Sequence, residues 1–156
     1  MLTLLNSGLS DNTVQLLAEG IRENSSLLYL DIRQNSIEND GVRALFNSLM
    51  GKEQFITLRI NSIHFEASLI ELMRKLFSHE NCFIQNLEME ELEMTEDNSS
   101  NVIDAVKCLR KLYTFDYSNN TLPLVMIPSI VEMTNKYGEL EILCLDHCEM
   151  TDAACN

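Results

Sequence analysis

The sequence predicts an α/β fold built from one structural unit that repeats along the chain. Six segments carry an apolar residue at the same position, at intervals of 28 or 29 residues: Leu2, Leu30, Leu58, Leu87, Phe115 and Leu143. Within these segments apolar and polar residues alternate, as in a half-buried strand, whereas between them apolar residues recur about every 3.6 residues, as in a helix. A short strand, a turn and a returning helix therefore alternate over the 156 residues.

The strand segments share a fixed set of apolar positions. In the clearest copy, "LLYLDIRQNSI" at 27–37, these are Leu27, Leu30, Ile32 and Ile37, with Asn35 between them. The same offsets recur in the last copy, "LEILCLDHCEM" at 140–150, in which Cys148 stands at the position of Asn35. We expect these residues to face a shared core, and their neighbours in sequence to face outward.

Helices are expected between the strand segments, in the ranges 11–24, 39–50 and 66–81, because each range places apolar residues on one face. A fourth helix carries Val102, Val106 and Leu109, and we expect it to begin late, after the polar residues "TEDNSS". The fifth is expected to begin at Pro128, because proline is favoured at the first helical position.

The strand segments resemble the leucine-rich repeat consensus L-x-x-L-x-L-x-x-N/C-x-L, in its ribonuclease-inhibitor-like form with repeats near 28 residues. The resemblance implies a right-handed α/β solenoid, a horseshoe segment with a parallel sheet on its concave face and helices on its convex face. It would contain about six repeats, with both terminal ones incomplete. Ile63 and Leu92 replace the asparagine of the consensus, so we expect the middle of the solenoid to be less regular.

The whole chain, 1–156, is predicted to form a single solenoid domain. It opens inside a strand segment and ends where the next helix would start. Because each repeat of a solenoid covers the core of its neighbour, the terminal faces would expose apolar residues. We therefore expect a fragment of a larger protein, with end-to-end contacts to flanking repeats or other chains.

Charge and composition narrow the class of partner. A net charge of -13 disfavours nucleic acid and anionic membranes and favours a basic protein surface. An apolar content of 46% is typical of a folded core. The sequence contains no apolar run of membrane-spanning length and no secretory signal. Five cysteines are typical of a reducing compartment, so we expect a cytoplasmic location.

The stretch "NLEMEELEMTED" at 86–97 contains six carboxylates, and the strand alternation explains where they lie. Glu88, Glu90 and Glu91 are expected on the concave surface, because the apolar residues between them face the core. Equivalent positions of successive repeats should then stack in two rows on that surface. One row is Thr3, Asp31, Arg59, Glu88, Asp116 and Cys144; the other is Leu5, Arg33, Asn61, Glu90, Ser118 and Asp146.

These rows predict a partner-binding surface. Arg59 should be neutralised between Asp31 and Glu88, whereas no cation is expected beside Glu90, Glu91, Asp116 or Asp146. Tyr and Arg often dominate the energetics of interfaces. The expected partner-binding residues are therefore Tyr29, Asp31, Arg33, Arg59, Glu88, Glu90, Glu91, Asp116 and Asp146. An alternative is that these carboxylates only keep the exposed sheet soluble and block edge pairing.

Catalysis, metal binding and cofactor binding are not expected. Cys144, His147, Cys148 and Cys155 are possible zinc ligands, but the strand register directs them to opposite faces. Paired carboxylates such as Glu88 would lie on an open surface with no pocket to shift their pKa values. The sequence has no glycine-rich phosphate loop.

The sequence therefore predicts a non-catalytic scaffold that binds a basic protein on its concave face. The resemblance leaves two alternatives open, because leucine-rich repeats carry many functions in their variable surface residues. One is a GTPase-activating protein of the Ran type. The other is a structural component of a large cytoskeletal or axonemal assembly.

Overall fold

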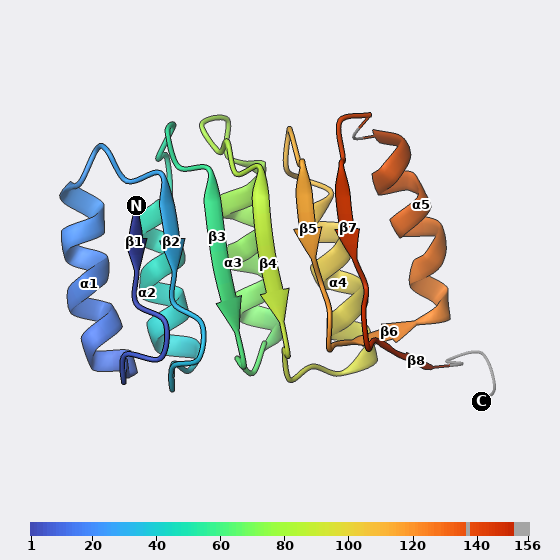
Figure 1. Cartoon of the computed structure of the whole chain (residues 1–156), viewed down its shortest axis with the longest axis horizontal. Coiled ribbons are helices and arrows are strands. Elements are labelled where there is room, and N and C mark those ends of the chain that lie inside the picture. The colour runs from blue at the N-terminus through green and yellow to red at the C-terminus, as the bar shows by residue number, and fades with distance from the viewer. Residues whose placement is uncertain (137, 152–156) are drawn as a thin grey trace.

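A computed structural model describes residues 1–136 and 138–151 of the chain. Its main sheet has six parallel strands in the order β1-β2-β3-β4-β5-β7, and helices alternate with them along the chain (Figure 1). These strands are β1 (Leu2–Thr3), β2 (Tyr29–Asp31), β3 (Thr57–Asn61), β4 (Asn86–Glu90), β5 (Thr114–Asp116) and β7 (Ile142–Cys144). The predicted α/β fold with a parallel sheet is confirmed.

In Figure 1 three of the described helices lie behind the strands, and the first and last helices flank the sheet at its two ends. The helices are α1 (Asp11–Glu23), α2 (Asn39–Leu49), α3 (Ala67–Ser78), α4 (Glu96–Val106) and α5 (Ile127–Lys136). A short 3-10 helix η1 (Leu124–Met126) precedes α5, and β6 (Thr121–Pro123) pairs in parallel with β8 (Glu149–Thr151) in a second, two-stranded sheet. None of the described helices or strands covers the other side of the main sheet, which we call the open sheet face.

The strand register agrees with the predicted repeat. Leu30 pairs with Leu2 on one side and with Leu58 on the other, and Phe115 pairs with Leu87 and Leu143. One step further along each strand, the first predicted row also forms: Thr3, Asp31, Arg59, Glu88, Asp116 and Cys144 are successive partners. The sheet therefore places residues that are 28 or 29 positions apart in sequence side by side.

The turn that follows each strand adopts the same unusual backbone conformation. Six non-glycine residues have positive φ angles between 47° and 59°: Asn6, Gln34, Ser62, Glu91, Asn119 and His147. They recur at the same intervals as the strands. Because a positive φ is costly for residues other than glycine, its recurrence means that the geometry of the turn is imposed by the packing of each repeat on the next.

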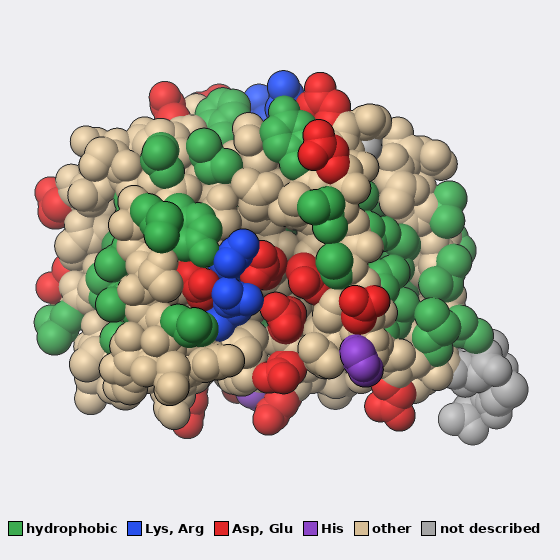
Figure 2. Space-filling view, viewed as in Figure 1, with side chains coloured by type: hydrophobic (Ala, Val, Ile, Leu, Met, Phe, Trp, Pro, Cys, Tyr) green, Lys and Arg blue, Asp and Glu red, His purple; other side chains and the backbone are tan. Residues whose placement is uncertain are grey.

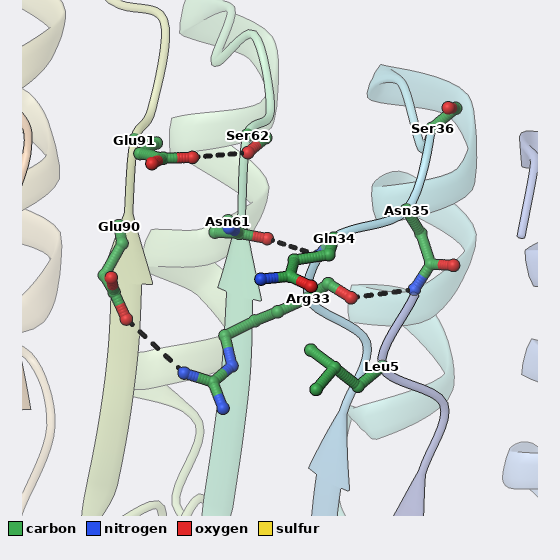
Figure 3. A pocket seen from close by; sticks show the side chains of 9 residues that line it. All are labelled: Leu5, Arg33, Gln34, Asn35, Ser36, Asn61, Ser62, Glu90 and Glu91. Carbon is green, nitrogen blue, oxygen red and sulfur yellow. Dashed lines mark hydrogen bonds and ion pairs between the residues drawn. The ribbon is translucent and has the colours of Figure 1, made fainter. Parts of the chain in front are cut away.

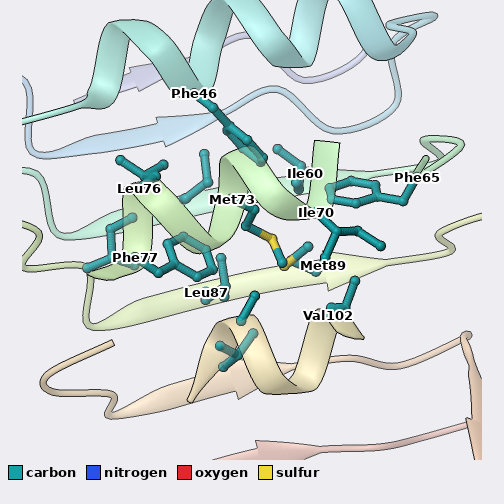
Figure 4. Close-up of a cluster of buried hydrophobic side chains, with 14 of the residues drawn as sticks. Phe46, Ile60, Phe65, Ile70, Met73, Leu76, Phe77, Leu87, Met89 and Val102 are labelled. Atoms are coloured by element: carbon teal, nitrogen blue, oxygen red, sulfur yellow. The ribbon is translucent and has the colours of Figure 1, made fainter. Parts of the chain in front are cut away.

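The core fills the space between the sheet and the helices. Phe46 of α2 and Phe65 pack with their ring centroids 6.4 Å apart, and both are fully buried. Met73 of α3 lies against the inward side chains of the sheet, among them Met89 of β4 (Figure 4). Because every inward position of the central strands is apolar and buried, this layer accounts for much of the hydrophobic stabilisation of the fold.

Helix α4 begins earlier than predicted. It starts at Glu96, and the hydroxyl of Thr95 caps it by accepting a hydrogen bond from the backbone N–H of Asn98 at 3.3 Å. The polar "TEDNSS" stretch thus provides the cap and first turn of the helix. Glu96 and Asp97 are favourable there, because carboxylates stabilise the positive end of the helix dipole.

Two buried or half-buried asparagines join successive repeats. The side chain of Asn120 accepts a hydrogen bond from the backbone N–H of Leu92 at 2.7 Å and donates to the carbonyl of Met89 at 2.8 Å. Asn35 acts in the same way toward the first repeat, accepting from the N–H of Leu9 at 3.0 Å. Each asparagine therefore satisfies turn backbone groups that would otherwise lose a partner.

The expectation that the middle of the sheet is less regular was wrong. Strands β3 and β4, which precede Ile63 and Leu92, are the longest of the described strands, with five residues each. Both aliphatic side chains are buried. Beside these side chains the backbones of the two repeats remain hydrogen-bonded to each other. The N–H of Glu93 donates to the carbonyl of Ile63 at 3.0 Å, and the N–H of Phe65 donates to the carbonyl of Glu93 at 3.1 Å.

The final repeat is less well buried than the central ones. Leu143 and Leu145 are half-buried, and Met150, expected in the core, is 62% exposed. In the described residues no later strand covers them. No helix in the described part of the chain has the length and apolarity needed to cross a bilayer.

Candidate functional site

The centre of the open sheet face carries five charged side chains in mutual contact, which we call the central ion-pair cluster: Asp31, Arg33, Arg59, Glu88 and Glu90. In Figure 2 basic side chains form a compact group in the middle of this face, and acidic ones surround it. The five residues come from the two predicted rows, so the parallel register brings them together.

Asp31 is the innermost member of the cluster. It is only 2% exposed, and its carboxylate accepts hydrogen bonds from Nε of Arg33 at 3.0 Å and from Nη2 of Arg33 at 2.9 Å. Burial raises the pKa of this carboxyl, but the hydrogen bonds and positive charge of Arg33 outweigh burial, so that its pKa is lowered overall. Asp31 was predicted to contact a partner; because it is buried, its role is to hold Arg33 in place.

Arg33 extends across β3 and reaches the acidic strand. Its Nη1 lies 2.9 Å from Oε2 of Glu88 and 3.5 Å from Oε1 of Glu90, and the dashed contact in Figure 3 marks the second pair. Its hydrogen bonds to Asp31 raise the pKa of Arg33. The prediction that no cation lies beside Glu90 was therefore wrong, because strand order alone did not include the length of an arginine side chain.

Arg59 lies where the sequence predicted it, between two carboxylates. Its Nη2 is 2.8 Å from Glu88 and its Nη1 is 3.9 Å from Asp31. Its guanidinium carbon also lies 5.3 Å from the centroid of the Tyr29 ring, a cation–π arrangement. Tyr29 is thus partly covered by Arg59, but its exposed remainder still forms part of the surface.

Glu88 is half-buried among these groups. Burial raises its pKa; Arg59 and Arg33 lower it, and Asp116 and Glu90 raise it, with a raised pKa as the net result. The expectation that this face has no pocket able to shift a pKa was wrong, because Glu88 lines a hollow on this face, in which burial raises its pKa.

Three predicted carboxylates lie outside the cluster, and in the described residues no lysine or arginine forms an ion pair with them: Glu91, Asp116 and Asp146. Glu91 accepts a hydrogen bond from the hydroxyl of Ser62 at 2.8 Å, and Asp116 accepts one from the N–H of Ser118 at 2.9 Å. These are neutral donors, so the negative charge of this side of the sheet is left without a compensating cation.

On one side of the central cluster, where the strands end, lies a mainly polar hollow of about 490 Å³ (Figure 3). Its lining residues come from the turns of the first four repeats: Leu5, Arg33, Gln34, Asn35, Ser36, Asn61, Ser62, Glu90 and Glu91. Most of its polar groups already bond one another, as when Asn61 accepts from the N–H of Gln34 at 2.7 Å.

On the other side, where the strands begin, lies a second hollow of about 310 Å³, which we call the strand-start hollow. It is lined by Tyr29, Thr57, Arg59, Asn86, Glu88, Thr114, Phe115, Asp116, Ile142 and Cys144. Its exposed apolar side chain is Ile142, which is 51% exposed, whereas the side chain of Phe115 is buried in the core beneath the sheet. The hollow therefore combines an apolar surface with a charged rim.

A third row, which the sequence analysis did not identify, forms the base of this hollow. Asn86 donates to the hydroxyl of Thr57 at 3.2 Å, and the hydroxyl of Thr114 donates to Asn86 at 2.9 Å. The row continues to Tyr29 and Ile142 by strand register. The sequence does indicate this third row, because each of its five residues lies two positions before a residue of the first predicted row.

The cysteines that suggested zinc lie on different surfaces. Cys144 lines the strand-start hollow, whereas Cys148 packs against the core and its thiol donates to the carbonyl of Tyr117 at 3.4 Å. Burial and the nearby carboxylates of Asp116 and Asp146 raise the pKa of the Cys144 thiol. Cys155 lies outside the described residues. In the described part of the chain no group of three or more His, Cys, Asp or Glu side chains could hold a metal ion.

Comparison with models of known protein families finds no match, and no curated protein proves similar to the chain.

Proposed function

We propose that the chain is a leucine-rich-repeat solenoid of the ribonuclease-inhibitor-like form, and that its open sheet face is the concave surface of a non-catalytic scaffold for a basic protein. The fold proposal is supported by the sequential order of the parallel strands and by the 28- or 29-residue register. Asn35 and Asn120 support it as well, because they bond turn backbone at the consensus asparagine position.

The single observation that carries the binding proposal is the uneven distribution of charge on the open sheet face. Both arginines of the central cluster already form ion pairs with carboxylates of the cluster itself, Asp31, Glu88 and Glu90. The carboxylates on its far side, Asp116 and Asp146, have no cation beside them in the described residues. Like charges held about one strand spacing apart repel, so a cationic partner surface lowers their electrostatic energy.

The test reverses the charge only at carboxylates outside the central ion-pair cluster, because changing Glu88 or Glu90 would also disrupt the ion pairs within the cluster. A variant with Glu91→Lys, Asp116→Lys and Asp146→Lys is compared with a control of equal charge change, Glu19→Lys, Glu23→Lys and Glu53→Lys, whose sites are exposed and away from the open face. Interacting proteins captured by the wild type are identified and their association rates are measured at several salt concentrations.

The first variant is expected to slow association at low salt, and the deficit should shrink as salt rises, because exposed charges act mainly on the association rate and are screened by ions. The control should retain most of the wild-type rate. Equal losses in both variants, or a deficit that does not change with salt, would reject the open sheet face as the site.

One observation favours the structural alternative as a second candidate. Several apolar side chains at the end of the molecule that carries α5 are exposed: Leu124, Val125, Ile127, Val131 and Met150. Hydrophobic side chains also gather at this end in Figure 2. An exposed apolar group of this kind is typical of a surface that contacts another protein. A component that packs end to end in a larger assembly would bury it.

We further propose a cytoplasmic location. The four cysteines within the described residues are free, and three of them, Cys108, Cys144 and Cys148, are only half-buried. Free thiols that are accessible to solvent persist more readily in a reducing compartment.

A further inference from the structure

The strand-start hollow and the uncompensated carboxylates lie in a fixed order along the strands. The hollow is formed at the first strand positions, by Thr57, Asn86 and Thr114. Asp116 stands two residues after Thr114, and Asp146 stands two residues after Cys144, the partner of Asp116 in the next strand. An apolar hollow is thus followed by two successive acidic positions.

The hollow is suited to one apolar side chain. Its volume of about 310 Å³ exceeds that of a single large side chain. Ile142, the sheet neighbour of Thr114, supplies exposed apolar surface at one end, and the ring of Tyr29 lines the other end. The hydroxyl and amide groups at its base are paired along the row from Thr57 through Asn86 to Thr114, so covering them with an apolar group leaves few polar atoms without a partner.

The spacing between the hollow and the carboxylates matches an extended peptide. Alternate side chains of an extended chain lie on the same side, about 6.6 Å apart. An apolar side chain over Thr114 would therefore be followed, two residues later, by a side chain over Asp116. Two residues further, the next would lie near Asp146. Cations at these two places would meet the carboxylates that have no cation beside them in the described residues.

We propose that the open sheet face binds an extended segment of a partner protein in which an apolar residue is followed by basic residues two and four positions later. The apolar side chain occupies the strand-start hollow, and the two cations contact Asp116 and Asp146. This inference rests on the proposed function and deepens it, because it assigns the basic partner a spacing and an apolar anchor.

Two peptides of identical composition test the spacing. The matched peptide is Gly-Ser-Leu-Ser-Lys-Ser-Lys-Gly, with acetylated and amidated ends. The control peptide, Gly-Ser-Leu-Lys-Ser-Lys-Ser-Gly, puts both lysines on the opposite side of an extended chain from the leucine. A third peptide replaces the leucine of the matched peptide with serine. Each is titrated into the isotopically labelled 156-residue chain, and amide chemical shifts are followed by NMR.

The matched peptide should bind about fivefold or more tightly than either of the other two, because each of them loses the apolar anchor or the paired cations. Its largest shifts should fall on Thr57, Asn86, Thr114 and Ile142. On the protein side, Ile142→Thr should remove the preference for the leucine peptide over the serine peptide. The control is Val131→Thr on α5, because Ile142 and Val131 are 51% and 52% exposed; it should leave the preference unchanged.

The outcomes separate the two proposals. Equal binding of all three peptides, with shifts confined to the carboxylate positions, overturns the spacing and the anchor but leaves the basic-partner proposal standing. Tighter binding of the matched peptide with shifts outside the hollow overturns the assigned site. Absence of binding by every peptide overturns both proposals. The amide spectrum of each free variant establishes that it is folded before it is titrated.

Discussion

Arg33, in the turn after β2, lies 2.9 Å from Glu88 on β4, so its side chain crosses the intervening strand β3. The same guanidinium also bonds Asp31, which is only 2% exposed. One arginine thus links the second repeat to the fourth. Arg33 also lines the hollow on one side of the central ion-pair cluster, and Arg59 lines the hollow on the other side.

Replacing Arg33 should destabilise the protein through Asp31. Arg33→Met leaves a buried carboxylate with only the more distant Arg59 as a charged partner, so we expect a loss of roughly 2–3 kcal/mol of unfolding free energy. Arg22→Met, at an exposed position on α1, should change it by less than about 0.5 kcal/mol. Urea denaturation measures both. Similar small effects would mean that Arg33 is not the main partner of Asp31.

Asp31 and Glu88 should affect the pH dependence of stability in opposite directions. The folded-state pKa of Asp31 is lowered, so the stability it supplies is present above its ordinary value of 3.8 and is lost as pH falls through the folded value. The pKa of Glu88 is raised above 4.5, so ionising it costs stability as pH rises through the folded value.

Unfolding free energies measured between acidic and neutral pH test this contrast. The advantage of the wild type over Asp31→Asn should shrink as the pH falls below 3.8. Relative to Glu88→Gln, the wild type should lose stability as the pH rises above 4.5. Parallel curves for wild type and both variants would contradict the pKa shifts.

Gly41 and Gly20 should respond oppositely to alanine. A Cβ atom at Gly41 in α2 would lie 2.6 Å from Oδ1 of Asp11 and 2.8 Å from Cγ2 of Ile37, and this Asp11 oxygen accepts the N–H of Glu38 at 2.7 Å. Gly41→Ala should therefore cost about 1–3 kcal/mol.

At Gly20, in α1, a Cβ atom meets nothing within 4 Å. Gly20→Ala should stabilise the protein by roughly 0.5–1 kcal/mol, because alanine has the higher helix propensity. Thermal and chemical denaturation of the two variants measure these changes in unfolding free energy. A stabilising Gly41→Ala would show that α1 and α2 are not packed as closely as described.

Asn120 should contribute more to stability than an exposed asparagine. Asn120→Ala removes the acceptor for the N–H of Leu92, in the turn of the preceding repeat, and the donor for the carbonyl of Met89, in its strand β4. We expect a cost of about 2–3 kcal/mol, since buried backbone groups are left without partners. Asn101→Ala, at an exposed position in α4, should have little effect or a slightly favourable one.

The apolar end of the molecule should promote self-association. Val125 and Val131 are 67% and 52% exposed and lie beside other exposed apolar residues of η1 and α5. A concentration-dependent sedimentation coefficient is therefore expected, and Val125→Lys with Val131→Glu should reduce it. Phe83→Glu, before β4, is the control, because Phe83 is 40% exposed in a different part of the molecule. A concentration-independent monomer would contradict the prediction.

The sequence by itself determined the repeated unit, the strand register and the first row of the open sheet face. Apolar periodicity carries this information because each inward residue must be buried, and a slip of one position would expose the whole set. The contact of Arg59 with Asp31 and Glu88 could be predicted for the same reason, since all three follow from the register alone.

The tertiary structure alone decided features that depend on the length and packing of particular side chains. The reach of Arg33 to Glu88 and Glu90, the burial of Asp31 and the hollow beside Phe115 arise from contacts across three or more strands. Periodicity places a side chain on a face but does not determine which neighbour it contacts. Charge and packing then select that neighbour among several within reach, and here they paired Glu90 with Arg33 and left Glu91, Asp116 and Asp146 as the carboxylates without an ion pair in the described residues.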